Sequence, residues 1–415
     1  MIIMETNLNL KILVLAFFHG LGHLSRSMSV AVHLKNRGHD VLFACSEEAL
    51  HIPQQAGLTC KPIREIEPLP PEREPKRTQS SSQTKTRSRL ANPEYLKRCI
   101  EEETLLMKEF NPDVVLHDYR LSAGVTSALN NIPSISLHNT NFFIYPLAQM
   151  IPDVIDTLNE LETPQYAIQK LFGDIMVIPD FSTFDNLSHM PRSMREIVLN
   201  SVREIHHTGP FIKNQPNNLP SKTQLKNSIS PHGMPLILIT FGGTAMGFAN
   251  YIKLLHSLRN IKAHYYVITG PNIDPDLLAL EIKQFKGSNP DSILEIISFT
   301  NQALELMKAA DLAIIHGGHT TVMEALMCGT PMIVIPQHEE QRLNAQRAVQ
   351  LKLGEIVHPD EIEAKITSAI EKRLKSNHSQ LGIQVANLLQ RTNGIENLIQ
   401  LIENDVMVNL QKMQH

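Results

Sequence analysis

Two histidines of this chain stand beside glycine turns, in the phrases Gly20-Leu-Gly22-His23 and His316-Gly317-Gly318. An imidazole can remove a proton from a hydroxyl group near neutral pH, so His23 is a candidate general base. His19 lies four residues earlier and is the rival candidate for the base. Alternatively, His19 would bind the acceptor, the molecule that carries the hydroxyl group. One of these two histidines could also serve only to satisfy the backbone of the loop.

A carboxylate that suits such a base stands at the end of the apolar run "DVVLHD". Asp118 could orient the imidazole and stabilise its protonated form. It could equally cap the start of the next helix. His138 and Phe142 follow the next apolar run, "SISL". We expect them to bind the acceptor, although aromatic side chains at this point also suit a core.

The second half of the chain contains a candidate anion site. The apolar run "LAII" leads into His316-Gly317-Gly318, and a helical pattern begins at about Thr320. The first amides of a helix lack intrahelical partners and favour a phosphate, and glycine lets the backbone approach it closely. Thr320 and Thr321 add hydroxyl donors, and His316 adds an imidazole donor. A capped turn with a buried histidine is the alternative interpretation.

Further polar groups follow neighbouring apolar runs. Glu324 lies one turn into the helix, where a carboxylate would repel phosphate but could accept hydrogen bonds from ribose hydroxyls. Glu340 and Gln341 follow "MIVIP" and combine acceptors with donors, which suits sugar hydroxyls; an exposed helix start would also favour a glutamate. Gly243 and Thr244 follow "LILIT" and form a second glycine-bent loop that we expect at the same ligand.

The elements that must position these residues alternate along the chain. Nearly continuous Val/Ile/Leu runs are typical of parallel strands that are covered on both faces. The expected strands are "KILVLAFF", "DVLFAC", "DVVLHD", "SISL", "LILIT", "HYYVIT", "ILEII", "LAIIH" and "MIVIP". The expected helices cover residues 25–37, 93–110, 302–310, 320–328 and 340–353.

This alternation predicts an α/β protein with two doubly wound, Rossmann-like domains. We expect an N-terminal domain over residues 1–215, which holds the candidate base, and a C-terminal domain over residues 216–385, which holds the candidate anion site. Residues 386–415 should form C-terminal helices that cross back to the first domain. The Pro/Asn/Ser-rich segment 210–235 has the composition of an interdomain linker.

Composition narrows the function classes. A chain of 415 residues is too long for one ordinary core, and its formal net charge of −4 gives no bulk support for nucleic-acid binding. The 4 cysteines lack metal-binding spacing and suit reduced thiols in the cytoplasm. No apolar run approaches the ~20 residues that span a bilayer. Residues 67–90 are rich in Pro, Ser and basic side chains; we expect a loop there, and peripheral membrane contact stays open.

A longer phrase carries a resemblance. The segment from "FTNQALELMKAADLAIIHGGHTTVMEALMCGTPMIVIPQHEEQRLNA" to "GEIV" resembles the donor-binding signature of family 1 glycosyltransferases, and it is similar to that of family 28. These are GT-B enzymes, with two domains that face each other across a cleft. The resemblance implies that His316 contacts the diphosphate of a nucleotide sugar, with Gly318, Thr320 and Thr321 beside it. It further implies that Glu324 binds the ribose.

The resemblance implies roles for four further side chains. Glu340 and Gln341 would hold the donor sugar. Plant relatives stack the base on a tryptophan, but this chain has 0 Trp, and Phe299 and Gln302 stand at the matching positions. Phe299 could still stack on a base, so the identity of the base is left open.

The start of the chain also resembles inverting GT-B enzymes. They carry a G-x-G-H phrase, followed by R-G-H-x-V, which stands here as Arg37-Gly38-His39-Asp40-Val41. A nicotinamide site would need a third glycine that this chain lacks. Retaining enzymes of another family carry two glutamates in E-x7-E, and His316 replaces the first of them.

The resemblance therefore implies an inverting, metal-independent hexosyltransferase without a cofactor. Its co-substrate would be a nucleotide diphosphate sugar, expected to be a UDP-sugar, and its acceptor a small-molecule or lipid-linked hydroxyl compound. His23, aligned by Asp118, would be the base. Two alternatives stay open: a GT-B-like UDP-GlcNAc 2-epimerase, and a catalytically silent partner protein of a glycosyltransferase.

Overall fold

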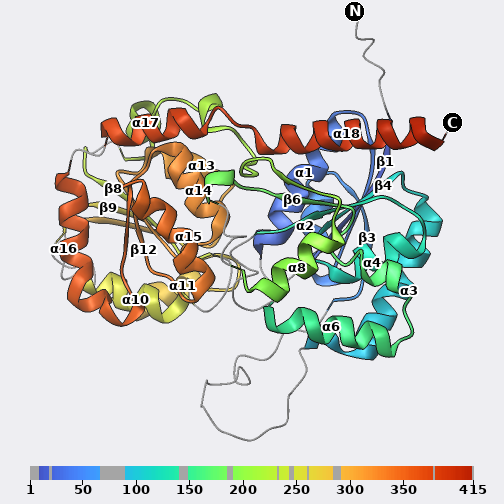
Figure 1. Cartoon of the computed structure of the whole chain (residues 1–415). Coiled ribbons are helices and arrows are strands. Elements are labelled where there is room, and N and C mark those ends of the chain that lie inside the picture. The colour runs from blue at the N-terminus through green and yellow to red at the C-terminus, as the bar shows by residue number, and fades with distance from the viewer. Residues whose placement is uncertain are drawn as a thin grey trace, which may run out of the picture. The chain divides into compact units, whose positions relative to one another are not determined.

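The computed structural model divides the chain into two compact units (Figure 1). It describes residues 9–17, 21–65, 89–139, 148–184, 190–230, 233–242, 247–258, 261–283, 291–376 and 379–413. Unit 1 contains the first strand, residues 23–211 and the helix that begins at Gly394, and unit 2 contains residues 212–393.

Unit 1 is built on a seven-stranded parallel sheet in the order β3-β2-β1-β4-β5-β6-β7. Its strands are β1 (Lys11–Ala16), β2 (Asp40–Cys45), β3 (Thr59–Pro62), β4 (Val114–Asp118), β5 (Ser134–Leu137), β6 (Ile175–Ile178) and β7 (Glu204–His207). Alternate residues of β1 enter different cores, because side chains of a strand point to opposite faces. Ile12 and Val14 pack in one cluster, and Leu13 and Leu15 pack in another. Both faces are thus covered, which explains the uninterrupted apolar run.

Helices flank this sheet (Figure 1). They are α1 (Leu21–Asn36), α2 (His51–Gln55), α3 (Pro93–Phe110), α4 (Leu121–Leu129), α6 (Ala148–Glu160), α7 (Gln165–Ile168), α8 (Arg192–Ser201) and α18 (Gly394–Met413). Short 3-10 helices are η1 (Glu47–Ala49), η3 (Arg89–Ala91) and η5 (Ser182–Phe184).

The last helix packs on the first domain through its apolar face. Ile395, Leu398, Ile399 and Ile402 of α18 are buried in the same cluster as Leu34 of α1. Each buried apolar side chain of this size contributes about 1.5–3 kcal/mol. The C-terminal helix is therefore an integral part of unit 1.

The Arg37-Gly38-His39 phrase contributes polar contacts to this helix. Arg37 Nη1 donates to Glu396 Oε1 at 2.8 Å, and Arg37 Nε donates to Glu403 Oε1 at 3.2 Å. His39 Nδ1 accepts from the Leu10 amide at 3.3 Å, so His39 Nε2 donates to Glu403 at 3.2 Å. In this fold the phrase anchors α18.

Unit 2 is built on a six-stranded parallel sheet in the order β10-β9-β8-β11-β12-β13. Its strands are β8 (Leu236–Thr240), β9 (His264–Ile268), β10 (Ile293–Ile297), β11 (Leu312–Ile315), β12 (Met332–Val334) and β13 (Gly354–Ile356). Its helices are α9 (Lys222–Ile229), α10 (Phe248–Ser257), α11 (Pro275–Glu281), α13 (Ala303–Ala309), α14 (His319–Cys328), α15 (Glu339–Gln350), α16 (Ile362–Lys375) and α17 (Ser379–Leu389). The 3-10 helices are η7 (Pro216–Asn218) and η9 (Pro359–Glu361).

The predicted fold class is confirmed, since both units are doubly wound parallel α/β domains. The expected linker over residues 210–235 needs a correction, because part of it folds as η7 and α9. Ser221 and Gln224 form a reciprocal capping box that starts α9, and Leu225 packs against Leu236 and Ala309. Its polar composition reflects a half-exposed helix rather than an unstructured linker.

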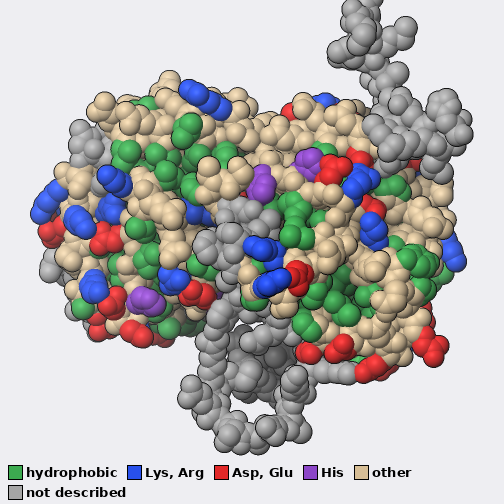
Figure 2. Space-filling model, viewed as in Figure 1, with side chains coloured by type: hydrophobic (Ala, Val, Ile, Leu, Met, Phe, Trp, Pro, Cys, Tyr) green, Lys and Arg blue, Asp and Glu red, His purple; other side chains and the backbone are tan. Residues whose placement is uncertain are grey.

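The described surface carries mixed charge. On the face shown in Figure 2, acidic and basic side chains lie intermixed over both units. No helix in the described ranges is both long and apolar enough to cross a membrane. In the same ranges, no three His, Cys, Asp or Glu side chains converge on a point that could hold a metal ion. The cysteines Cys45, Cys60, Cys99 and Cys328 are unpaired thiols.

Candidate active site

Each sheet has one topological switch point, where strand order reverses and where open α/β sheets bind ligands. In unit 1 this point lies between β1 and β4, and in unit 2 it lies between β8 and β11. The segment after β4 begins at Tyr119, and the segment after β11 begins at His316. The candidate residues of both halves therefore lie at the ligand-binding edges of their sheets.

The structure brings His23 and Asp118 into contact within unit 1. The His23 Nδ1 atom lies 2.9 Å from Asp118 Oδ1. The Nδ1–H of the imidazole donates to this carboxylate, because an ionised carboxylate can only accept. That tautomer leaves a lone pair on Nε2. The alternative role of Asp118 as a helix cap is wrong, since α4 starts at Leu121 and its N-cap is Arg120.

Asp118 has further partners that the sequence did not suggest. Arg26 Nε donates to Asp118 Oδ2 at 2.8 Å, and Arg26 Nη2 donates to Oδ1. Ser27 Oγ donates to Oδ2 at 2.9 Å. Burial alone would raise the pKa of Asp118, but the charge of Arg26 and the hydrogen bonds from His23 and Arg26 outweigh it and hold this pKa well below its usual range. The carboxylate is therefore ionised and oriented by three side chains.

Aromatic rings surround the imidazole. The ring centroid of Tyr119 lies 5.0 Å from that of His23, and the ring of Phe17 lies 6.1 Å from it. Tyr119 has a φ of 62°, a left-handed conformation that costs energy for a bulky residue and clusters at functional sites. His138 packs against Tyr119 at a centroid distance of 5.6 Å. Burial lowers the pKa of His138 well below its ordinary value, so this ring is neutral.

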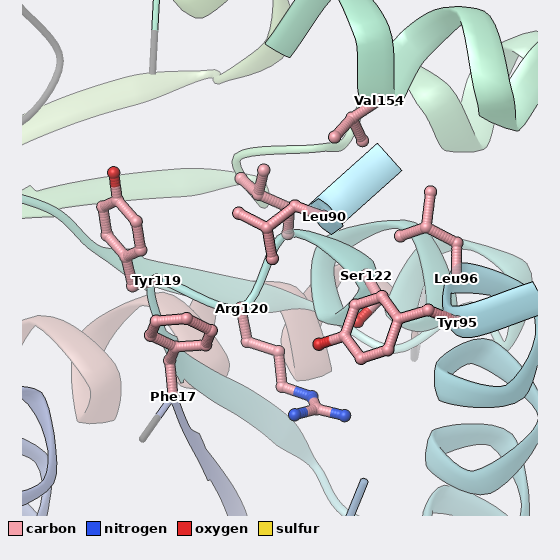
Figure 3. A pocket seen from close by; sticks show the side chains of 9 residues that line it. Phe17, Leu90, Tyr95, Leu96, Tyr119, Arg120, Ser122 and Val154 are labelled. Atoms are coloured by element: carbon pink, nitrogen blue, oxygen red, sulfur yellow. The ribbon is translucent and has the colours of Figure 1, made fainter. Parts of the chain in front are cut away.

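A small pocket opens beside these rings (Figure 3). Seven of its nine lining residues are apolar or aromatic; the complete lining is Phe17, Leu90, Tyr95, Leu96, Tyr119, Arg120, Leu121, Ser122 and Val154. Arg120 is the charged member, but Nε donates to Glu103 at 2.5 Å and Nη1 donates to Glu65 at 2.8 Å. The two carboxylates offset its charge, so the pocket suits an uncharged, apolar group.

Unit 2 places the imidazole of His316 between two glycines. A Cβ atom at Gly318 would lie 2.6 Å from His316 Nε2, and one at Gly242 would lie 2.8 Å from it. Neither distance leaves room for a methyl group, so these glycines are required for the observed ring position. Gly242 also has a φ of 80°, which favours glycine. Burial lowers the pKa of His316 to about 4, and the ring is neutral near pH 7.

The helix start beside His316 can accept an anion. Gly318 is the N-cap of α14 and supplies no side chain to cap the first amides. The first turn carries no acidic residue, and it contains Thr320 and Thr321, both half-buried. Helix amides without a side-chain cap favour negative charge. His316, Gly318 and the two threonines thus lie at one helix terminus.

Glu324 follows on the same helix and is half-buried. Burial raises its pKa to about 7. Within the described residues its carboxylate has no hydrogen-bond partner. A carboxylate held in this way is suited to accept hydrogen bonds from ligand hydroxyls.

Helix α15 is tied to the glycine turn by Asn344, whose role the sequence did not predict. Asn344 Nδ2 donates to the Gly317 carbonyl at 3.1 Å and to Glu340 Oε1 at 3.2 Å. Gln341 Oε1 accepts from the Gln337 amide at 2.7 Å, so part of its side chain stabilises the local turn. Glu340 is half-buried and Gln341 is buried. Asn344 follows Glu340 by four residues, and this spacing places both side chains on one face of a helix, so their contact could have been predicted from the sequence.

The structure does not bring the remaining candidates among the described residues into contact with these side chains. Phe299 is 66% exposed, and Gln302 is the exposed N-cap of α13. His19, Phe142, Gly243 and Thr244 lie outside the described residues, as does most of the 67–90 segment.

Several known proteins are similar to this chain in sequence. Residues 235–400 match the model of the glycosyltransferase family 28 C-terminal domain. The NDP-glycosyltransferase YjiC of Bacillus licheniformis is 22% identical over 359 residues, which cover 83% of this chain and 84% of that protein. An uncharacterized glycosyltransferase of Methanopyrus kandleri is 26% identical over 66% of this chain and 72% of its own length.

Solved structures share the fold. A UDP-glucosyltransferase from Polygonum tinctorium superposes with a TM-score of 0.66 at 13% identity, covering 95% of this chain and 98% of that chain. At this identity the likeness shows the fold alone, which is GT-B. The resemblance drawn from the sequence is confirmed: the chain is a glycosyltransferase of the GT-B type, and its residues 235–400 match the model of the glycosyltransferase family 28 C-terminal domain.

Proposed function

We propose that the chain is an inverting glycosyltransferase that moves a sugar from a nucleotide diphosphate sugar, most simply a UDP-sugar, to a hydroxyl acceptor. The observation that carries this proposal is the 2.9 Å contact between His23 Nδ1 and Asp118 Oδ1 at the switch point of unit 1. This contact leaves the lone pair of Nε2 to act as a base.

In the proposed reaction, His23 Nε2 takes the proton of the acceptor hydroxyl. The acceptor oxygen forms a bond to the anomeric carbon of the sugar, while the bond from that carbon to the phosphate oxygen breaks. One displacement inverts the configuration at the anomeric carbon. The nucleotide diphosphate leaves with the bonding electron pair, and the imidazolium retains the proton until the product departs.

Unit 2 would stabilise the charge that grows on the leaving diphosphate. His316 donates one hydrogen bond, and the amides at the start of α14 donate others. In the proposed mechanism these groups do the work that a metal cation does in other transferases. Glu324 would bind the ribose hydroxyls, Phe299 and Gln302 the base, and Glu340 and Gln341 the sugar. Gly243 and Thr244 would complete the donor loop.

The names of the relatives support a nucleotide-sugar donor, since one is an NDP-glycosyltransferase and one is a UDP-glucosyltransferase. The mostly apolar side chains that line the small pocket beside Phe17 and Tyr119 favour an acceptor with an uncharged, apolar part. Both a small molecule and a lipid-linked compound meet this description. His138, whose ring adjoins Tyr119, would shape this site, together with His19 and Phe142.

The test uses the full chain, its His23→Ala variant and a matched control, His33→Ala. His33 lies on the same helix, where its ring contacts the Ser29 carbonyl. A thermal-shift screen with UDP-, dTDP- and GDP-sugars identifies the donor, and mass spectrometry of acceptor mixtures detects products. His23→Ala should still be stabilised by the donor but should transfer sugar roughly 10²–10⁴-fold more slowly. Normal transfer by this variant would contradict the proposed base.

A further inference from the structure

Arg26 lies three residues after His23, and this spacing places both side chains on one face of α1. Its guanidinium forms a fork on Asp118, through Nε to Oδ2 at 2.8 Å and through Nη2 to Oδ1. The side chains of Arg26 and Asp118 are 7% and 0% exposed. This is a buried, bidentate ion pair, the geometry in which arginine cannot be replaced by lysine without loss.

The same guanidinium also faces the imidazole. Arg26 Nη2 lies 3.1 Å from His23 Nδ1. Because Nδ1–H donates to Asp118, both of these nitrogens carry protons, and they cannot form a hydrogen bond with each other. A positive charge on the imidazole would therefore meet a second positive charge at contact distance.

The charge balance differs from that of an ordinary His–Asp pair. In such a pair the carboxylate stabilises the imidazolium that forms when the base takes a proton. Here the guanidinium already neutralises Asp118, so the cluster is neutral before proton transfer and carries one positive charge after it. After proton transfer the imidazolium and the guanidinium would lie at contact distance and share one carboxylate.

Other titratable groups that face His23 do not supply this positive charge. Tyr119 and Asp118 face it from the end of β4, and His138 faces it from the end of β5. Burial lowers the pKa of His117, beside Asp118, to about 4 and lowers that of His138 well below its ordinary value. Both rings are neutral near pH 7, so within the described residues Arg26 is the cation in contact with the imidazole.

We propose that Arg26 is a positioning residue that fixes Asp118 in line with His23 and sets a positive charge against the imidazole. This inference rests on the proposed role of His23 as the base. It assigns two separable tasks to Arg26: the fork orients the carboxylate, and the charge faces the ring.

Two variants separate these tasks. Arg26→Lys retains the charge but loses the fork, and Arg26→Gln loses the charge. Ser27→Ala is the matched control, since it removes one hydrogen bond to Asp118 Oδ2 and no charge. The readout is the titration of the Cε1–H signal of residue 23 in full-length protein with labelled histidine. The signal is assigned by its absence from His23→Ala, so the measurement does not depend on activity.

Arg26→Gln should move the titration of the imidazole to higher pH by about one unit or more, the size expected when a neighbouring charge is removed. Arg26→Lys and Ser27→Ala should leave it near its original place. In transfer assays the acid limb of kcat/KM should move in the same direction for Arg26→Gln. Arg26→Lys should lower kcat roughly 10- to 100-fold with little change in KM, because the carboxylate is misplaced.

An unmoved titration in folded Arg26→Gln would overturn this inference. If that variant does not fold, the double variant Arg26→Gln/Asp118→Asn removes both buried charges together. Its imidazole should titrate close to that of the unaltered chain, and a displacement of a unit or more would overturn the inference. Transfer by His23→Ala at the normal rate would instead contradict the proposed base, so the two failures are distinguishable.

Discussion

Replacement of Glu324 by glutamine should stabilise unit 2 at alkaline pH and leave its stability almost unchanged at acidic pH. Burial raises the pKa of Glu324 from the ordinary value of 4.5 to about 7. Below pH 4.5 the folded and unfolded chains both hold the proton. Between pH 4.5 and about 7 the unfolded chain releases it first, so the free energy of unfolding falls as the pH rises.

Above pH 7 the ionised carboxylate costs its full amount. A rise in pKa from 4.5 to about 7 corresponds to about 3 kcal/mol, and the partial exposure of the side chain makes this an upper bound. Urea unfolding at pH 5 and pH 8 measures the difference between the two proteins. Glu363→Gln, on the exposed face of α16, is the control and should show no such pH dependence.

The same substitution should weaken the donor site. If Glu324 accepts hydrogen bonds from ribose hydroxyls, its loss should reduce donor affinity roughly 10- to 100-fold, as expected for a hydrogen bond to a charged group. If Glu324→Gln is more stable at pH 8 but binds the donor more weakly, the carboxylate of Glu324 lowers stability and serves donor binding. An equal difference in unfolding free energy at pH 5 and pH 8 would refute the assignment of a buried, raised-pKa carboxylate.

Two glycine substitutions test close approaches in unit 2. Gly318→Ala places a Cβ 2.6 Å from His316 Nε2, so we expect the ring to move and donor affinity to fall at least about tenfold in calorimetric titrations; unchanged affinity would remove His316 from the donor site. Gly382→Ala places a Cβ 2.3 Å from the Gly329 carbonyl oxygen and should lower the unfolding free energy by about 1–3 kcal/mol in urea titrations. Its neighbour Ile383 is 60% exposed, and Ile383→Ala should change stability by less than about 0.5 kcal/mol; equal effects at both positions would contradict the packing argument.

Most central strands could be predicted from the sequence because they are buried on both faces, but the equally buried β6, "IMVI", was not among the expected strands. The runs "KILVLA", "DVLFAC", "VVLHD", "LILIT" and "LAII" all appear as strands. The edge strands β3 and β7 could not, because "TCKP" and "EIHH" are mostly polar and half-exposed or exposed. Strand β13 has only three residues, which is too short for any period.

Part of the candidate site could also be predicted from the sequence, because its residues follow buried strands. Asp118 and His316 stand at strand ends, where the topology itself brings chemistry together. The bidentate contact of Arg26 with Asp118 could not be predicted, because the sequence places the start of the helix near Ser25 and the structure places it at Leu21. Only a helix that already includes His23 puts Arg26 on the same face.

Other details depend on three-dimensional contacts. Gln341 was expected to bind sugar, yet its Oε1 accepts from the Gln337 amide, a contact that follows from the curvature of the turn. The capping box at Ser221, by contrast, could have been read from the spacing of serine and glutamine. The polar composition of residues 210–235 suggested a linker, although the segment contains the helix α9.

The most direct test of the whole account is a crystal structure of the full chain with UDP bound. The account predicts the β-phosphate within hydrogen-bond distance of His316 Nε2 and of the amides that open α14, with the ribose hydroxyls on Glu324. A UDP molecule bound elsewhere, with His316 and the start of α14 untouched, would contradict it.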